Sequence, residues 1–552
     1  MGGISLDNRI LFSPTIEWVS NPNGVARVPM SGAKGNIILH TYDRFTKEYV
    51  VFNYDANTGK QIWSTYLPAG GYASPTIGDG VIFLPCGYTQ ICGLDENTGE
   101  RLWTKELNSR NRSTPTFYKS LAYLGVGNKI LGISADGNIE KECSVVGVMF
   151  YGNPLIINNY LYILGDSNPT KNKSLLNIFA INLNSMELSW KIELGPAAMV
   201  SCDSSGLAYH ESGLIFAGGF DGILRCIDIK EKTIKWEAKG QGILTRSKPI
   251  VKKQMVYVNS LEGYIMGVNI NTGKVKFNQF LSPEGMWCPP VIYDNYLWVH
   301  SGVFLYILQT NNGEVVNKIA IGHSPYTDFE IASGKLYIAA GDPPDWFYLY
   351  CLRLSNNPRF TIKKTKIDYK YRDDENFDDL DIIFNVSTAD GIIPENLKVD
   401  LRKFGGSDSY EPKVLRPKEY LISIKLPKFN RYGDYALIAE AKIGNGTYKT
   451  TIPVCLREYI PNDIPDSYQI ENFLLQQQEK DYYSGSAVMK SVLNFYGKEL
   501  NQQEINDMGE YLDDLGIHGH HKWRTGSVRI LHASTNIRNN DDGEILEKIS
   551  FK

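Results

Sequence analysis

A ten-residue segment recurs after forty residues with the same turn and the same closing tryptophan, and this repeat restricts the fold more than any other feature of the chain. Residues 54–63 read YDANTGKQIW, and residues 94–103 read LDENTGERLW. Each copy predicts a strand, a tight Asn-Thr-Gly turn and a second strand that carries Trp. A repeat of about 40 residues built from short strands is typical of a β-propeller, in which each repeat forms one blade.

Weaker copies extend the pattern along the first two-thirds of the chain. They lie at residues 133–138, 181–185, 227–230, 268–273, 308–313 and 352–357, which makes eight turns in all. The region after Asp328 supplies three strands and no fourth, whereas Thr15 to Trp18 looks like an outer strand without a blade of its own. We therefore predict that the N-terminal strand completes the last blade, because a closed ring has no open edges. Residues 1–356 are expected to form eight blades, with seven as the alternative.

The tryptophans of the repeat have two interpretations. Exposed aromatic rings stack on sugars, whereas rings at a regular spacing dock between neighbouring blades, and the spacing favours docking. The aromatic residues predicted at loop tips are candidates for ligand contact, with burial as the alternative: Tyr72, Trp287, Tyr326 and Trp346.

The turn and its Trp resemble the repeat of pyrroloquinoline-quinone-type propellers, Asp-x-x-Thr-Gly-x-x-x-Trp. The resemblance covers about residues 10–355 and implies the fold more strongly than a function. Quinone dehydrogenases of that family have two adjacent cysteines near the cofactor, and this chain has no Cys-Cys pair. The resemblance therefore favours the non-enzymatic members, which act as assembly or surface-binding scaffolds, and no cofactor is predicted.

Composition sets the outer limits of the interpretation. A length of 552 residues predicts several domains, and a net charge of −4 gives no electrostatic reason to expect nucleic acid. The sequence has no stretch of 18 apolar residues, so no membrane-spanning helix is predicted. The N-terminus lacks the basic segment and following apolar segment of a leader peptide. Of the eight cysteines, most are expected to be buried free thiols, and a Cys86–Cys92 bridge across a hairpin is the alternative.

A second domain is predicted for residues 357–457. It contains short strand-like runs, and Gly433-Asp434-Tyr435 resembles the entry to a late strand of immunoglobulin-like sandwiches. The Cys-Trp-Cys core of antibody domains is absent, so only the general fold is implied. The acidic run at residues 373–379 is a possible calcium site, but a solvated loop is the preferred interpretation.

The third domain, residues 458–552, is expected to be helical. Residues 476–498 (QQQEKDYYSGSAVMKSVLNFYGK) resemble the start of papain-like cysteine peptidases that process bacteriocin leaders. In that family a Gln helps to form the oxyanion hole and a Cys at a helix N-terminus is the nucleophile. The resemblance assigns these positions to Gln478 and Ser484.

This segment departs from the peptidase pattern at the nucleophile and at the C-terminal half. Ser484 replaces the Cys, and the β-rich half that carries the family's catalytic His is missing. Three explanations remain open: a natural pseudoenzyme, an engineered Cys-to-Ser change, and a chance similarity. The one His cluster, His518, His520 and His521, is a weak metal candidate whose spacing is not that of a structural zinc site.

Three functions follow from these features. The preferred one is a non-catalytic scaffold of a cell surface or virion, in which the propeller binds a protein or glycan. The second is an enzyme derived from a cysteine peptidase, with its nucleophile replaced. The third is a quinone-dependent dehydrogenase. The oligomeric state and the identity of the ligand stay open.

Overall fold

The computed structural model describes most of residues 13–456, and the chain divides into two compact units, Met1–Arg457 and Glu458–Lys552. Gaps in the description lie at residues 23–24, 27–30, 34, 43–48, 68, 71–72, 88, 112, 151, 168–173, 197–205, 245–247, 284, 287, 324–328, 343–345, 356–358, 371–376, 389–390 and 428–432. The predicted helical segment at residues 458–552 lies outside the described residues.

The described part is almost entirely β-structure, as the repeat predicted. The only helix among the described residues is the three-residue 3-10 turn η1 (Arg402–Phe404). A membrane-spanning helix needs about 20 apolar residues, and none of the described residues form one. The first sheet contains β2 (Val25–Ala26), β3 (Ser31–Ala33), β4 (Asn36–Tyr42), β5 (Tyr49–Asp55) and β6 (Gln61–Leu67). The second contains β7 (Thr76–Gly78), β8 (Val81–Pro85), β9 (Gln90–Asp95) and β10 (Arg101–Glu106). The third contains β11 (Thr116–Tyr118), β12 (Leu121–Val126), β13 (Lys129–Ile133) and β14 (Ile139–Ser144). The fourth contains β15 (Val148–Phe150), β16 (Leu155–Ile157), β17 (Tyr160–Ser167), β18 (Leu175–Asn182) and β19 (Glu187–Pro196).

The next sheets repeat the same antiparallel order. The fifth contains β20 (Ala208–His210), β21 (Leu214–Gly218), β22 (Ile223–Asp228) and β23 (Thr233–Lys239). The sixth contains β24 (Ile250–Lys252), β25 (Met255–Asn259), β26 (Tyr264–Asn269) and β27 (Val275–Phe280). The seventh contains β28 (Val291–Tyr293), β29 (Tyr296–Ser301), β30 (Phe304–Gln309) and β31 (Val315–Ala320). The eighth contains β32 (Glu330–Ala332), β33 (Lys335–Asp342), β34 (Trp346–Ser355) and β1 (Ser13–Ser20).

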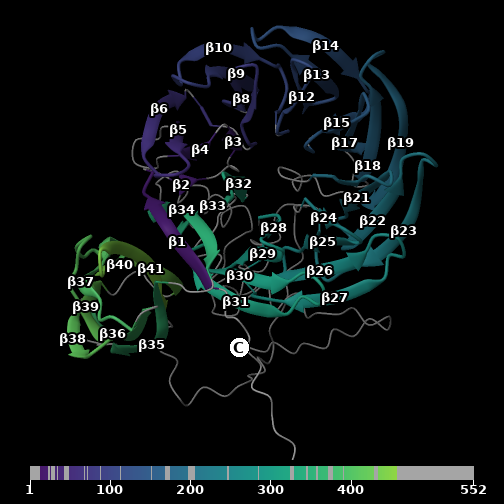
Figure 1. Cartoon of the computed structure of the whole chain (residues 1–552). Helices are drawn as coiled ribbons and strands as arrows, with labels where there is room; N and C mark the ends of the chain where they lie inside the picture. Colours follow the sequence, from purple (N-terminus) through teal and green to yellow (C-terminus); the bar gives the residue numbers. More distant parts are fainter. Residues whose placement is uncertain are drawn as a thin grey trace, which may run out of the picture. The chain divides into compact units, whose positions relative to one another are not determined.

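Consecutive sheets lie side by side around a ring (Figure 1) and share apolar cores. Each of eight clusters of buried side chains among the described residues draws its members from two neighbouring sheets. One of these clusters joins the eighth sheet to the first through Trp18, Tyr337 and Ile37. Burial of apolar surface therefore continues across every junction, including the one that joins the two ends of the series.

The repeat tryptophans dock between neighbouring sheets, as predicted. For four of them the indole N–H donates to a carbonyl in the next sheet, at the residue directly after the Asp, Ser or Asn that opens its turn. The bonds run from Trp18 to Ala56 (3.1 Å), Trp63 to Glu96 (3.4 Å), Trp103 to Ala135 (2.6 Å) and Trp236 to Ile270 (2.7 Å). The indole N–H is only a donor, and the buried ring finds its acceptor in a backbone carbonyl of the neighbouring sheet. Trp190 packs against the core between the fourth and fifth sheets.

The glycine of each turn is required for this docking. Gly99 has a φ of +73°, and a Cβ atom added there would lie 2.4 Å from Cε3 of Trp63. Gly59 stands in the same relation to Trp18. The turn itself is held by an aspartate: Oδ1 of Asp55 accepts hydrogen bonds from the backbone N–H groups of Asn57 and Thr58 and from the Thr58 hydroxyl. The Asn-Thr-Gly sequence therefore both forms the turn and provides a flat surface for the ring.

Two junctions replace the indole donor by another group. Lys141 occupies the Trp position of the third sheet, and its ammonium donates to the Leu183 carbonyl at 2.5 Å. Phe277 occupies it in the sixth sheet and has no donor, so the Tyr257 hydroxyl donates instead to the Thr310 carbonyl at 2.8 Å. The carbonyl acceptor is thus satisfied even where the Trp is lost.

The N-terminal strand completes the eighth sheet, which confirms the predicted closure. β1 pairs antiparallel with β34, from Ser13 opposite Ser355 to Ser20 opposite Leu349. β1 also meets β41 (Gly446–Leu456) at Ile16 and Lys449, so the eighth sheet continues into β40 (Gly433–Ile443) and β37 (Glu395–Val399). One strand therefore joins the ring to the domain that follows it.

That following domain consists of two sheets packed on one core. Its second sheet contains β35 (Phe360–Lys370), β36 (Phe377–Thr388), β39 (Glu419–Pro427) and β38 (Lys413–Arg416). Phe384 of this sheet and Leu437 of β40 belong to the same buried cluster. Most of the acidic run predicted as a solvated loop lies outside the described residues, and its last part begins β36.

Two of the described cysteines form a disulfide, and most of the others are buried thiols. Cys86 and Cys92 form a disulfide across the β8–β9 hairpin, the alternative considered for this pair. Four other described cysteines are buried free thiols, as expected, and Cys455 is exposed.

The junction of the first two sheets contains a buried histidine. His40 is 1% exposed, its Nε2 has no hydrogen-bond partner among the described residues, and its ring centroid lies 5.9 Å from that of Tyr49. Burial lowers the pKa of His40 to about 4, because the charged form loses its hydration. The native protein therefore holds this imidazole neutral.

Replacing Gly99 by Ala should destabilise the protein by about 3 kcal/mol, because a strained left-handed residue and an overlap with Trp63 add together. Gly80→Ala is the matched control, since Gly80 has a φ of +77° but nothing within 4 Å of an added Cβ. We expect the control to cost about 1 kcal/mol in urea unfolding. Equal losses in the two variants would contradict the docking role of Gly99.

The His40 environment predicts a loss of stability in acid. Between pH 6.5 and about 4 the unfolded chain binds a proton that the native state excludes, so the free energy of unfolding should fall as the pH falls. The loss attributable to His40 is about 3 kcal/mol. His40→Leu should flatten this part of the pH–stability curve, measured by urea unfolding at a series of pH values, and an unchanged slope would refute the assignment.

Candidate functional site

The junction between the seventh and eighth sheets has a buried apolar core but lacks the contact between an outer-strand tryptophan and a neighbouring hairpin turn. In the eighth sheet β34 ends at Ser355, the chain enters β35, and the fourth strand is β1 from the other end of the chain. No hairpin therefore joins the third and fourth strands of this sheet. The outer strand of the seventh sheet carries Asn317 opposite Ile307, the position that Trp63 occupies opposite Asn53 in the first sheet. Both halves of the Trp–turn contact are thus absent here.

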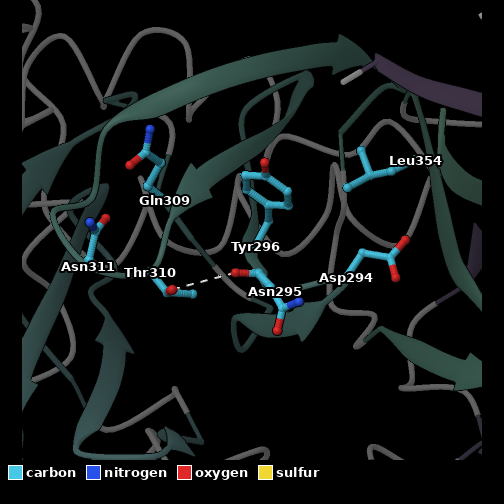
Figure 2. Close-up of a pocket in the computed structure, with 7 residues that line it drawn as sticks. All are labelled: Asp294, Asn295, Tyr296, Gln309, Thr310, Asn311 and Leu354. Carbon is cyan, nitrogen blue, oxygen red and sulfur yellow. Dashed lines mark hydrogen bonds between the residues drawn. The ribbon is translucent and has the colours of Figure 1, made fainter. Parts of the chain in front are cut away.

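A hollow of about 610 Å³ lies at this junction. It is lined by the hairpin turn Asp294, Asn295 and Tyr296, by the following turn Gln309, Thr310 and Asn311, and by Leu354 of β34. Figure 2 shows the Tyr296 ring between Gln309 on one side and Leu354 on the other. We call this group of seven residues the seam hollow.

Hydrogen bonds fix the two turns that form the seam hollow. The Thr310 hydroxyl donates to the Asn295 carbonyl at 3.5 Å, the dashed line in Figure 2. Lys252 donates to Oδ1 of Asn295 at 2.8 Å. By contrast, the Asp294 carboxylate and the side-chain amides of Gln309 and Asn311 have no hydrogen-bond partner in the described part of the chain. The backbone is therefore held while several polar side-chain groups stay available.

In the sixth sheet the two equivalent turns are joined by a side-chain hydrogen bond. There Gln254 stands in the place of Asn295, and Asn271 in the place of Asn311. The Asn271 amide donates to Oε1 of Gln254 at 2.5 Å, which links the two turns. The structure gives no such bond between Asn295 and Asn311, so these two side chains do not link the turns of the seventh sheet.

A second polar cluster lies where the ring meets the following domain. The Asp400 carboxylate accepts hydrogen bonds from the Tyr348 hydroxyl (2.7 Å) and from Nη2 of Arg402 (2.7 Å). Burial opposes ionisation of Asp400, but these donors outweigh it and hold the pKa of the carboxyl below its usual value. Lys403, which is 4% exposed, donates to the Ala436 carbonyl at 2.7 Å. All these groups are paired with one another, so the cluster is a structural contact.

Arg225 of the fifth sheet is likewise engaged within the fold. It is 5% exposed and pairs with Asp221 (2.6 Å) and Glu237 (2.8 Å). Burial alone would lower the pKa of the Arg225 guanidinium, but the two carboxylates raise it. This arrangement holds the turn before β22 and leaves no group poised for proton transfer.

Two of the buried thiols, Cys226 and Cys351, are unsuited to nucleophilic chemistry. Burial raises the pKa of Cys226 to about 12 and that of Cys351 to about 12, so both are protonated near neutral pH.

The structure does not describe the site residues that were predicted from the sequence. Gln478, Ser484, His518, His520 and His521 lie outside the described residues, and so do Tyr72, Trp287, Tyr326 and the side chain of Trp346. The seam hollow was missed at the sequence level. Its signals were available: Asn317 where a Trp is expected, and a last repeat that lacks a fourth strand.

The described residues do not fit a quinone cofactor of the kind that the repeat implies. The chain has no adjacent cysteines, and Cys86 and Cys92 are bonded across a hairpin instead. In the described part no three His, Cys, Asp or Glu side chains gather as ligands for the accompanying metal ion. We therefore derive no redox step.

Two solved structures resemble this chain over about three-fifths of its length. The crystal structure of BamB from Moraxella catarrhalis is 15% identical and covers 62% of this chain and 98% of its own, with a TM-score of 0.49. A europium-containing methanol dehydrogenase is 10% identical and covers 61% of this chain and 93% of its own, with a TM-score of 0.52. The latter likeness shows a shared β-propeller fold and, at that identity, nothing about activity. No curated protein matches the sequence.

The sequence itself gives a more specific result. Residues 19–159 and 177–340, more than half of the chain, match the family described as outer membrane protein assembly factor BamB. These ranges contain the Trp-docked turns and most of the eight sheets described above. The chain belongs to this family of β-propeller proteins.

Proposed function

We propose that the protein is a non-catalytic scaffold whose propeller binds a partner protein. Membership of the BamB family is the observation that carries this proposal, because the family description is that of an assembly factor. The eight sheets and the eight cores between them support a ring of eight blades rather than seven. A ring with an apolar core at each of its junctions is a rigid platform, which suits binding without rearrangement.

The outer strand of the first sheet offers a place for such a partner. β6 lies at the edge of its sheet, and Ile62 and Tyr66 on it are 49% and 63% exposed. Leu102 on the outer strand of the second sheet is 50% exposed. An extended segment of another protein can add to a free edge and place alternate side chains against such apolar residues. We infer that the partner presents an apolar strand to β6.

The disulfide supports a location outside reducing compartments. Cys86 and Cys92 are both fully buried, and disulfides persist mainly in extracellular, periplasmic or virion settings. This agrees with the cell-surface or virion location expected from the sequence. The following domain, with two sheets on one core, supports an immunoglobulin-like spacer. The proposal keeps the C-terminal segment as a degenerate peptidase module, on its sequence resemblance alone.

A quinone-dependent dehydrogenase is the second candidate, favoured only by the shared fold with methanol dehydrogenase. Its test is dye reduction by the full chain after addition of pyrroloquinoline quinone and calcium or a lanthanide. We expect no alcohol-dependent rate.

Exchanging both exposed apolar residues of β6 for charged ones, Ile62→Asp with Tyr66→Asp, should weaken partner binding. Charges on this edge would oppose both strand addition and apolar contact. Cross-linking of the full chain in an envelope extract, followed by mass spectrometry, identifies the partner, and affinity is then measured with the purified pair. We expect a loss of at least about tenfold, equivalent to about 1.4 kcal/mol.

Val414→Asp is the matched control, since Val414 is 61% exposed on β38 of the other domain. It should leave affinity unchanged. Equal affinity of the β6 double variant and the wild type would exclude this edge as the binding surface.

A further inference from the structure

We propose that the seam hollow is a binding site for a neutral carbohydrate, separate from the edge that binds the partner protein. The hollow combines uncommitted polar side chains, one aromatic ring and a fixed backbone at a junction where the usual seal is missing. This inference goes beyond the proposed scaffold function and does not depend on it.

The polar groups of the seam hollow match vicinal hydroxyls. A sugar hydroxyl both donates and accepts, so adjacent hydroxyls pair well with a carboxylate or a carboxamide. The Asp294 carboxylate offers acceptors, and the amides of Gln309 and Asn311 offer both donors and acceptors. None of these three side chains has a hydrogen-bond partner in the described part of the chain, so a ligand does not have to displace an existing contact.

The apolar groups of the seam hollow match the other face of a sugar. Tyr296 is half-buried, and its ring lies between polar and apolar neighbours (Figure 2). Leu354, also half-buried, supplies the apolar neighbour. The C–H face of a pyranose packs against such a ring while its hydroxyls reach the rim, which is the mixed apolar and polar lining typical of small-molecule sites.

Charge and size narrow the ligand class further. The lining contains one carboxylate and no Lys or Arg, and nearby Lys252 already donates to Asn295 at 2.8 Å. A phosphate or carboxylate ligand would therefore meet like charge without a free cation. A volume of about 610 Å³ lies within the range of sites for small ligands and accommodates one or two sugar rings.

The absence of the seal explains why this hollow occurs at the seventh sheet. In the sixth sheet the matching turns are joined by the bond from Asn271 to Gln254. Closure of the ring by β1 removes the turn that would otherwise meet the outer strand of the seventh sheet. Because strands from both ends of the chain complete the eighth sheet, the hairpin turn is missing there, and the seam hollow lies beside it.

The test is saturation-transfer NMR on the full chain with methyl glycosides of glucose, galactose and mannose, and with N-acetylglucosamine, each at up to about 50 mM. This concentration range detects a dissociation constant of about 1 mM, which corresponds to about 4.1 kcal/mol of binding free energy. We expect saturation transfer to at least one neutral sugar. Glucose 6-phosphate and glucosamine serve as an anionic and a cationic comparison. The proposal is overturned if none of the four neutral sugars receives saturation, or if only one of the charged sugars does.

Two independent variants locate the binding. Asn311→Ala removes an amide, and Asp294→Asn removes the charge but retains a residue that tolerates the left-handed φ of 47° at this turn. We expect each to weaken the affinity about five- to tenfold, the usual effect of one hydrogen bond to a ligand. Unchanged thermal unfolding midpoints show that both variants are folded.

Asn271→Ala is the matched control, at the equivalent turn of the sixth sheet. It should leave sugar affinity unchanged, because its amide bonds Gln254 rather than a ligand. Affinities that are unaltered in both hollow variants, or lowered equally in the control, would place the sugar elsewhere and refute the site.

Discussion

The contact between a tryptophan and the glycine turn of the next sheet is the interaction on which the rest of the propeller depends. Trp63 donates its indole N–H to the Glu96 carbonyl, and its ring covers Gly99, where a side chain would collide with it. The Thr65 hydroxyl adds a bond to the Gly99 carbonyl at 2.6 Å. At the junctions that have this contact, a directional bond and a steric fit thus set the position of one sheet against the next, while the apolar cores supply most of the stabilisation.

Closure of the ring links the propeller to the domain that follows it. β1 pairs with β34 along its length and reaches β41 at one point, and Ile438 of β40 shares a cluster with Ile16. The paired charges of Asp400 and Arg402 and the Tyr348 hydroxyl add directional contacts at the same place. The chain therefore uses its N-terminus and its second domain at the junction where the regular turn is missing. The seam hollow lies beside this arrangement.

The sequence predicted the parts of this architecture that recur. Docking of the tryptophans, completion of the last sheet by Thr15 to Trp18, and burial of most thiols follow from local patterns that repeat or alternate. It did not predict that Lys141 and Tyr257 would replace the indole donor, because these substitutions only make sense once the Leu183 and Thr310 carbonyls are seen in the neighbouring sheet. The candidate site was harder still to predict, since Asp294 and Asn311 come from two different turns and Leu354 from a strand of the next sheet.

The sequence by itself determined the fold class and the family, because an Asn-Thr-Gly turn followed by Trp encodes both a hairpin and the ring that docks on its neighbour. It also indicated the order of the sheets and the strand that closes them. Only the tertiary structure decided at which junction a surface hollow forms. Whether Asn271 meets Gln254, or Asn311 remains unpaired, depends on distances between turns that the linear pattern does not contain. The difference is physical: a repeat specifies contacts that every junction shares, whereas a binding site arises where one junction lacks them.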